Sequence, residues 1–198
     1  MAQPLDPFAV LELPRRLCLD AQALEASVRR LVIAQHPDRF HLQGAQAVAD
    51  AQARTSQIND AARILRSFDK RIAYMLDMAG ESADERFTPP AALLQQVFDL
   101  NEAIDAMQEA QADGDADAVA QAAEDLRDAS AAVRAMRADV SARLEQGAQA
   151  WDAAQAASED SGAPPAALAQ ARTALRAALG HARYLDNLLG RLQPLPNP

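Results

Sequence analysis

Apolar residues recur every three or four positions through most of the second half of this chain, and this spacing constrains the fold more than any other feature. An α-helix returns to the same face every 3.6 residues, so the pattern gathers apolar side chains on one face. Three stretches carry it: Leu93, Val97, Leu100, Ile104 and Met107; then Val119, Leu126, Val133, Met136, Val140 and Leu144; then Leu168, Ala171, Leu175, Ala178, Ala182, Leu185, Leu189 and Leu192. Breaks at 113–115 and 158–165 separate them. Short connections predict an antiparallel three-helix bundle, with Thr88 as the cap of its first helix.

Composition agrees with an all-α fold. Hydrophobic residues make up 49% of the chain but aromatic residues only 4%. Alanine, the best helix former, is the most frequent of the hydrophobic residues. No run approaches the roughly 18 apolar residues of a membrane span, and the N-terminus lacks the pattern of a secretory signal. Cys18 is the only cysteine, which excludes an intramolecular disulfide and favours a reducing, cytoplasmic location.

The first 80 residues predict four shorter helical segments. A short one follows Asp6-Pro7 and ends before Pro14. The next three are expected over 20–35, 46–66 and 69–78. Residues 81–87 are polar and indicate a linker, so the predicted division is 1–80, 81–87 and 88–198.

Charge also divides the chain. Residues 1–80 hold ten basic and nine acidic side chains, whereas residues 81–198 hold nine basic and nineteen acidic ones. This asymmetry indicates two functional halves. An acidic second half argues against nucleic-acid binding, which needs cations to replace the phosphate counterions.

His36-Pro37-Asp38 lies in the break between two predicted helices. Alone it could be a helix stop, because the residue before a proline avoids the α region. Together with the basic helix before it and the longer amphipathic helix after it, the tripeptide resembles the central turn of a J-domain. A J-domain is the module with which co-chaperones trigger ATP hydrolysis by a DnaK-class chaperone.

Further stretches carry a more specific resemblance: residues 6–14, Leu19-Asp20 with Ala23-Leu24, residues 36–40, 93–102 and 183–186. Together they cover most of the chain and resemble the HscB family, the J-type co-chaperones of iron–sulfur cluster assembly. The Ala- and Gln-rich region 148–165 looks longer than the connection usual in the family. No cysteine pairs precede the J-domain, which fits a bacterial-type member.

The resemblance implies two partners, of which the first is a DnaK-class chaperone, HscA. The residues expected to bind it are His36, Pro37, Asp38, Arg29, Arg30 and Arg39. Asp38 would accept charge-assisted hydrogen bonds from an arginine of the chaperone. The arginines would steer the encounter with an acidic surface. Taken alone, they also fit an ordinary solvated helix face.

The second implied partner is the iron–sulfur scaffold protein IscU. Leu94 and Phe98 are apolar but lie outside the core stripe of their helix, beside Gln95, Asp99 and Glu102; Tyr184 and Leu188 are similarly offset on the last helix. Surplus apolar residues flanked by acids indicate a docking patch. The alternative is that Phe98 and Tyr184 pack under the J-domain.

The expected function is therefore that of a monomeric, non-enzymatic co-chaperone without a cofactor, which brings IscU to HscA and stimulates its ATPase. Three alternatives stay open: a J-protein for general clients, a structural helical adaptor, and a small metallohydrolase that uses His36, Asp38 and His41. The last is disfavoured because zinc sites need three or four well-placed ligands. No phosphate-binding loop or catalytic cysteine motif is present.

Overall fold

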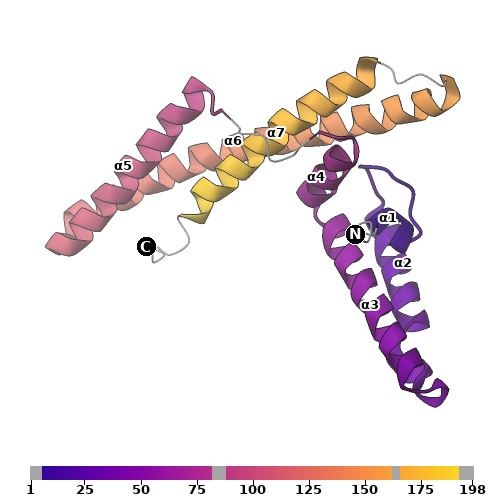
Figure 1. Cartoon of the computed structure of the whole chain (residues 1–198). Helices are drawn as coiled ribbons and strands as arrows, with labels where there is room; N and C mark the ends of the chain where they lie inside the picture. Colours follow the sequence, from indigo (N-terminus) through magenta and orange to yellow (C-terminus); the bar gives the residue numbers. More distant parts are fainter. Residues whose placement is uncertain (1–5, 82–87, 162–165, 192–198) are drawn as a thin grey trace. The chain divides into compact units, whose positions relative to one another are not determined.

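A computed structural model describes residues 6–81, 88–161 and 166–191, and within these ranges the secondary structure is entirely helical (Figure 1). The α-helices are α1 (Pro7–Val10), α2 (Ala21–Ala34), α3 (Ala45–Arg66), α4 (Phe68–Met78), α5 (Ala91–Asp113), α6 (Ala116–Ser161) and α7 (Ala166–Gly190), with two short 3-10 helices, η1 (Pro37–Arg39) and η2 (His41–Gln43). The predicted all-α fold is confirmed.

The chain forms two compact units. The hairpin unit comprises residues 1–83 with 148–172, and the bundle unit comprises residues 84–147 with 173–198. Helices α6 and α7 therefore contribute to both units. The functional division at residues 80 and 88 stays a prediction, because these units are defined by packing alone.

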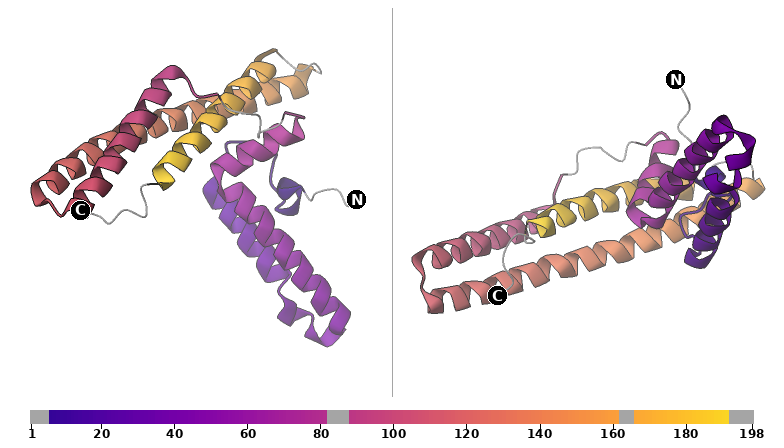
Figure 2. Two further views of the ribbon diagram at one scale, coloured as in Figure 1. Left: turned by 60° about the vertical axis from the view of Figure 1, so that its left-hand side comes forward. Right: turned by 90° about the horizontal axis from the view of Figure 1, so that it is seen from below.

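In the hairpin unit, α2 and α3 lie side by side in every view and are joined through the two 3-10 helices (Figure 2). Asp20 caps α2 by accepting a hydrogen bond from the Gln22 N–H. The core between α1, α2, α3 and α4 contains Phe8, Leu11, Leu24, Leu31, Ile58, Leu65, Ile72 and Leu76. Both guanidinium contacts of Arg66 with Glu25 are 2.7 Å long and join α3 to α2 near the start of α2.

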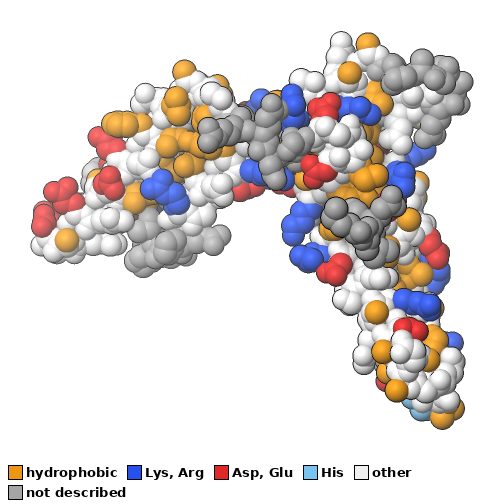
Figure 3. Space-filling model, in the orientation of Figure 1, with side chains coloured by type: hydrophobic (Ala, Val, Ile, Leu, Met, Phe, Trp, Pro, Cys, Tyr) orange, Lys and Arg blue, Asp and Glu red, His pale blue; other side chains and the backbone are white. Residues whose placement is uncertain are grey.

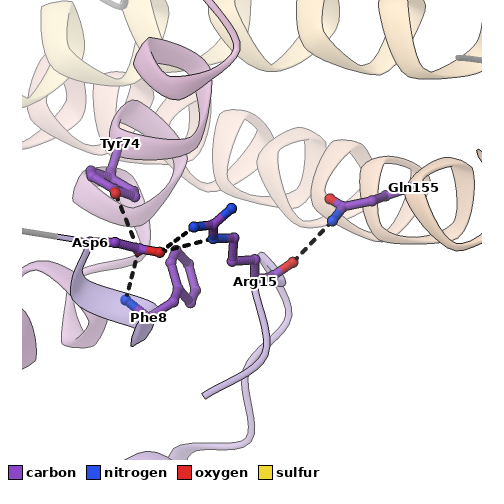
Figure 4. A network of polar contacts seen from close by, with 5 residues as sticks. All are labelled: Asp6, Phe8, Arg15, Tyr74 and Gln155. Carbon is purple, nitrogen blue, oxygen red and sulfur yellow. Dashed lines mark hydrogen bonds and ion pairs between the residues drawn. The ribbon is translucent and has the colours of Figure 1, made fainter. Parts of the chain in front are cut away.

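A polar cluster around Asp6 joins α1, the following loop and α4 (Figure 4). Its carboxylate accepts hydrogen bonds from the Phe8 N–H, from two nitrogens of Arg15 and from the Tyr74 hydroxyl. Burial opposes ionisation of Asp6, but these donors together hold its pKa below the usual value. Burial and the Asp6 charge raise the pKa of Tyr74 to about 12.

Part of α6 also holds the loop that precedes α2. Asp152 accepts hydrogen bonds from the backbone N–H groups of Leu17 and Cys18, each 2.8 Å long. The buried Arg71 donates to the Leu17 carbonyl at 2.6 Å, and burial lowers its pKa although Cys18 and Asp152 oppose that shift. Residues far apart in sequence therefore fix the backbone just before α2.

The bundle unit is antiparallel. The turn between α5 and α6 is made by Gly114 in the left-handed conformation, with φ +70°. Beside this turn a small core forms from Met107, Ala110, Ala122 and Ala123, with Val119 and Leu126 packed against it. Further along α6, Arg137 pairs with Asp186 of α7, and Gly147 lies against Leu175 of the same helix. The later residue of α6 thus meets the earlier residue of α7, so these two helices run in opposite directions.

Three details of the sequence-based interpretation are wrong. Thr88 does not cap α5, which begins after Pro90 without a side-chain cap. Residues 148–161 of the expected long connection are helical and belong to α6, since their alanines favour helix and pack inward at Ala148 and Ala154. Leu188 is buried rather than offset to the surface. Residues 82–87 of the linker, 162–165 of the connection, and Leu192 of the third stripe lie outside the described residues.

Candidate partner-binding surfaces

The first candidate surface, called here the turn surface, consists of His36, Pro37 and Asp38 with the exposed Arg29 and Arg39. Proline is well tolerated at the first position of a helical turn, and Pro37 takes that place in η1. The Arg39 N–H then donates to the His36 carbonyl at 3.0 Å, and the Phe40 N–H donates to the Pro37 carbonyl at 2.9 Å. The tripeptide is thus a defined turn of 3-10 helix.

His36 and Asp38 are held in fixed relation by the backbone. The His36 Nδ1 accepts a hydrogen bond from the Asp38 N–H at 3.3 Å and lies 3.5 Å from the Asp38 carboxylate. An Nδ1 that accepts this bond carries no proton, so it cannot also donate to the carboxylate. The Asp38 side chain is 88% exposed and its oxygens are open to a donor on another molecule.

A second layer of contacts supports the turn from α3 and from the loop. The Thr55 hydroxyl donates to the carbonyl of Gln35, the residue that ends α2, over 3.0 Å. The His41 ring contacts the Asp38 carbonyl through Nδ1. The segment just before His36 is therefore fixed by a residue of another helix.

The predicted arginines differ in their surroundings. Arg29 and Arg39 are exposed, as expected of groups that could meet an acidic partner. Arg30 is also exposed but forms an ion pair with Glu12 and lies 3.4 Å from the Ser27 hydroxyl. The charge of Arg30 is therefore already paired within the hairpin unit, and an ion pair this exposed contributes little to stability.

The second candidate surface, the α5 face, consists of Leu94, Gln95, Phe98, Asp99 and Glu102. Leu93, Leu100, Ile104 and Met107 fill the core, as expected from the apolar stripe. Leu94 and Phe98 are left 52% and 62% exposed, and Glu102 continues their row at the next four-residue step. Gln95 donates to Asp99 at 2.8 Å in the adjacent row. The face is apolar along its centre and acidic beside it.

Tyr184 lies on α7 and is half-buried. Two residues further along the same helix, Asp186 forms a two-point ion pair with Arg137, at 2.8 and 3.2 Å. Of the six predicted scaffold contacts, Tyr184 is therefore the one on α7, whereas the other five lie on α5.

The structure also identifies residues that the sequence did not single out. Among the described residues, the exposed large apolar side chains are Leu94 and Phe98, which the sequence predicted, and Ile33, Leu42 and Met78, which it did not single out. Ile33 lies outside the Leu24, Val28 and Leu31 stripe of α2, a signal that was present in the sequence. Thr55 and Asp152 act through hydrogen bonds to backbone groups distant in sequence, and no local pattern points to such bonds.

The metallohydrolase alternative finds no site within the described ranges, where no three His, Cys, Asp or Glu residues are gathered for a metal ion. His36 and His41 instead contact backbone atoms of Asp38. None of the helices in the described part of the chain is long and apolar enough to cross a membrane.

Figure 3 shows one face of the molecule, with hydrophobic side chains beside a histidine at the end of the α2–α3 hairpin. Hydrophobic and acidic side chains also lie together over the bundle unit in this view. By the residues that define them, the turn surface carries Arg29 and Arg39 with the exposed Asp38 carboxylate, whereas the α5 face carries two apolar side chains beside acidic ones.

Comparison with known proteins places this arrangement in a family, although no family model matches the chain. A co-chaperone protein HscB homologue of Azoarcus sp. (strain BH72) is 34% identical over 137 residues, which cover 68% of this chain and 75% of the relative. One from Chromobacterium violaceum is 31% identical over 113 residues, covering 56% of this chain and 63% of the relative.

Two solved structures share the fold. Chaperone HscB from Vibrio cholerae superposes with a TM-score of 0.52 at 22% identity, covering 95% of this chain and 99% of that one. Human co-chaperone protein HscB gives a TM-score of 0.60 at 18% identity, covering 100% of this chain and 86% of that one. The fold is an N-terminal J-domain followed by a C-terminal helical domain. Together with the sequence identity to the Azoarcus relative over three quarters of its length, this fold assigns the chain to the HscB co-chaperone family.

Proposed function

We propose that this protein binds the iron–sulfur scaffold IscU and delivers it to the DnaK-class chaperone HscA, whose ATPase it stimulates during cluster assembly and transfer. The observation that carries the proposal is the Asp38 carboxylate, held outward on a turn whose backbone is fixed on both sides. Family membership supports the co-chaperone role, and the geometry of the two surfaces supports the division of labour.

The turn surface contacts the chaperone. A carboxylate on a rigid turn can accept two hydrogen bonds from one arginine, and bonds of this charge-assisted kind are among the strongest polar contacts. Orienting the Asp38 carboxylate for binding costs little free energy, because the contacts of Gln35 and His36 already hold the backbone of the turn. Arg29 and Arg39 add positive charge that steers the encounter toward an acidic surface.

The α5 face contacts the scaffold. Leu94 and Phe98 offer apolar area that the bundle core does not use, and aromatic side chains are frequent anchors of protein interfaces. Gln95, Asp99 and Glu102 select a partner with complementary donors and cations. Tyr184 is proposed as a further scaffold contact from α7.

Single-turnover ATP hydrolysis by the chaperone, measured with and without this protein, tests the turn surface. Wild-type protein should accelerate hydrolysis, and Asp38→Asn, which removes a charge-assisted acceptor, should reduce the acceleration about tenfold or more. Asp50→Asn is the matched control: Asp50 is an exposed acid on α3 that only accepts a bond from Gln46. No acceleration by the wild type, or equal acceleration by both variants, would contradict the proposal.

A test with different client proteins distinguishes the proposed function from its main alternative, a co-chaperone that serves unfolded proteins in general. The scaffold should increase chaperone stimulation further when it is present together with this protein. If denatured proteins replace the scaffold with equal effect, the general-client role is the correct one.

A further inference from the structure

A pocket of about 270 Å³ lies within the hairpin unit, where α4 meets the parts of α6 and α7 that belong to the same unit. Two guanidinium groups and a wall of apolar side chains line it, contributed by Arg15, Arg172, Met75, Met78, Trp151 and Leu168. No acidic side chain is among the described residues that line this pocket. The turn surface and the α5 face include none of these residues, so the proposed function does not use the pocket.

Arg172 carries a positive charge that the described part of the chain leaves without an anionic partner. Its guanidinium carbon lies 5.3 Å from the centre of the Trp151 ring, a cation–π contact that holds the planar group over the aromatic face. The Arg172 Nε is buried and has no hydrogen-bond partner. A buried N–H without an acceptor is costly, because its bond to water is lost and not replaced. The fold thus holds a cation at the pocket and supplies no anion for it.

Arg15 supplies a second guanidinium that is already oriented. Its Nε and Nη2 donate to Asp6 at 2.9 and 2.6 Å, which leaves Nη1 without a hydrogen-bond partner among the described residues (Figure 4). The Arg15 carbonyl accepts a hydrogen bond from the side-chain amide of Gln155 at 3.4 Å, so this residue is held at both its backbone and its side chain. Because Asp6 balances the charge of Arg15, the stronger attraction for an anion comes from Arg172.

We propose that this pocket binds a small organic acid, whose carboxylate pairs with Arg172 and Arg15 and whose apolar body packs against the apolar wall. A guanidinium and a carboxylate match each other in a planar, two-point pairing. A bare inorganic anion would leave the apolar wall unused, and a neutral apolar molecule would leave Arg172 unpaired, so a ligand with both parts fits best. Small-molecule sites usually begin at roughly 300 Å³, so the apolar body is about the size of one amino-acid side chain.

The fluorescence of Trp151 tests the inference, because Trp151 lines the pocket and is the only tryptophan of the chain. Hydrocinnamate, a carboxylate on an aromatic body, is titrated into the full-length protein and should change the emission in a saturable way, with a dissociation constant in the millimolar range. Hydrocinnamamide has the same shape without the charge, and inorganic phosphate has charge without the apolar body. Each should bind about tenfold more weakly, because one of the two kinds of contact is missing.

Arg172→Gln should weaken hydrocinnamate binding about tenfold, because the carboxylate loses its main partner. Met78→Glu should weaken it as well, since Met78 is half-exposed at the pocket and an acid there competes for the guanidinium groups. Arg134→Gln is the matched control, an exposed arginine of the bundle unit, and should bind like the wild type.

Three results would overturn the inference: no saturable change in the wild type, phosphate binding as tight as that of hydrocinnamate, or equal affinities of the Arg172 and Arg134 variants. None of these results depends on the chaperone or the scaffold, so the proposed function stands or falls separately.

Discussion

The turn surface and the α5 face are both exposed, but they are built in different ways. The turn surface depends on an irregular backbone, which side chains from α3 and from the turn itself hold in place. The α5 face is one side of a regular helix whose opposite side fills the bundle core. Substitutions outside the contact area should therefore disturb the turn surface, whereas the α5 face should respond mainly to changes in its own contact residues.

The largest expected effect concerns the α5 face. Leu94→Ala with Phe98→Ala should weaken scaffold binding by about 4 kcal/mol, since each central apolar anchor commonly has an effect of about 2 kcal/mol or more. Isothermal titration calorimetry with IscU measures this, and Met78→Ala serves as the exposed apolar control. Affinity within a factor of two of the wild type would place the scaffold site elsewhere.

The next effect concerns the support of the hairpin unit. Asp152→Ala should destabilise the segment before α2 by about 2–3 kcal/mol, because two backbone N–H groups lose a charged acceptor. Hydrogen exchange of the Leu17 and Cys18 amides should accelerate, and Glu145→Ala, an exposed acid of the same helix, should leave both amides unchanged. Unaltered protection in the Asp152 variant would mean that α6 does not support this loop.

A smaller effect is expected at the junction of α2 and the turn. Thr55→Val keeps the size of the side chain but removes the donor to the Gln35 carbonyl, at a cost of about 1 kcal/mol. Chaperone stimulation at saturation should fall, while scaffold binding stays at the wild-type value. Thr55→Ser should restore stimulation because it keeps the hydroxyl. Equal loss in both variants would assign the effect to packing instead of to the hydrogen bond.

The smallest effect is a shift in titration within the polar cluster that joins α1 to α4. In a Tyr184→Phe background, the absorbance of the remaining tyrosinate should report the Tyr74 pKa of about 12. Asp6→Asn should lower it toward the ordinary value of about 10, because the nearby negative charge is gone. The proposed binding of the scaffold to the α5 face should not change in the Asp6 variant.

The pKa shifts of Tyr74 and Asp6 also make the free energy of unfolding depend on pH. Tyr74 has a higher pKa in the folded protein than in the unfolded chain, so it contributes stability below about pH 10, and that contribution is lost as the pH rises toward about 12. Asp6 has a lowered pKa, so its contribution is present above the ordinary aspartate pKa and is lost as the pH falls through the folded value. Thermal unfolding across the two pH ranges would measure both.

Much of this architecture can be predicted from the sequence because it depends on local rules. Helix periodicity, the Asp20 cap and the Gly114 turn determine α2, α5 and their limits to within a residue or two. Exposure of Leu94 and Phe98 follows from the same periodicity, since the core stripe of α5 was already complete. The roles assigned to both surfaces stay predictions that binding experiments must test.

The details that the sequence did not predict depend on tertiary contacts. The bonds from Asp152 to Leu17 and Cys18 join residues more than a hundred positions apart, and the pairing of Thr55 with Gln35 requires the hairpin to be closed. Residues 148–161 were expected to belong to a connection, because the Ala- and Gln-rich region 148–165 looks longer than the connection usual in the resembled family. They continue α6 because Ala148, Trp151 and Ala154 are buried, which gives the segment an apolar face.

The central claim is that a single chain must use both surfaces at once, and a mixing experiment tests it most directly. Chaperone ATP hydrolysis is measured in the presence of IscU with Asp38→Asn, with the Leu94→Ala and Phe98→Ala variant, and with both proteins together. Each variant alone should lack the scaffold-dependent acceleration, and the mixture should lack it too, because neither molecule can bridge the partners. Full acceleration by the mixture would contradict the account, since the two surfaces would then act without being joined in one molecule.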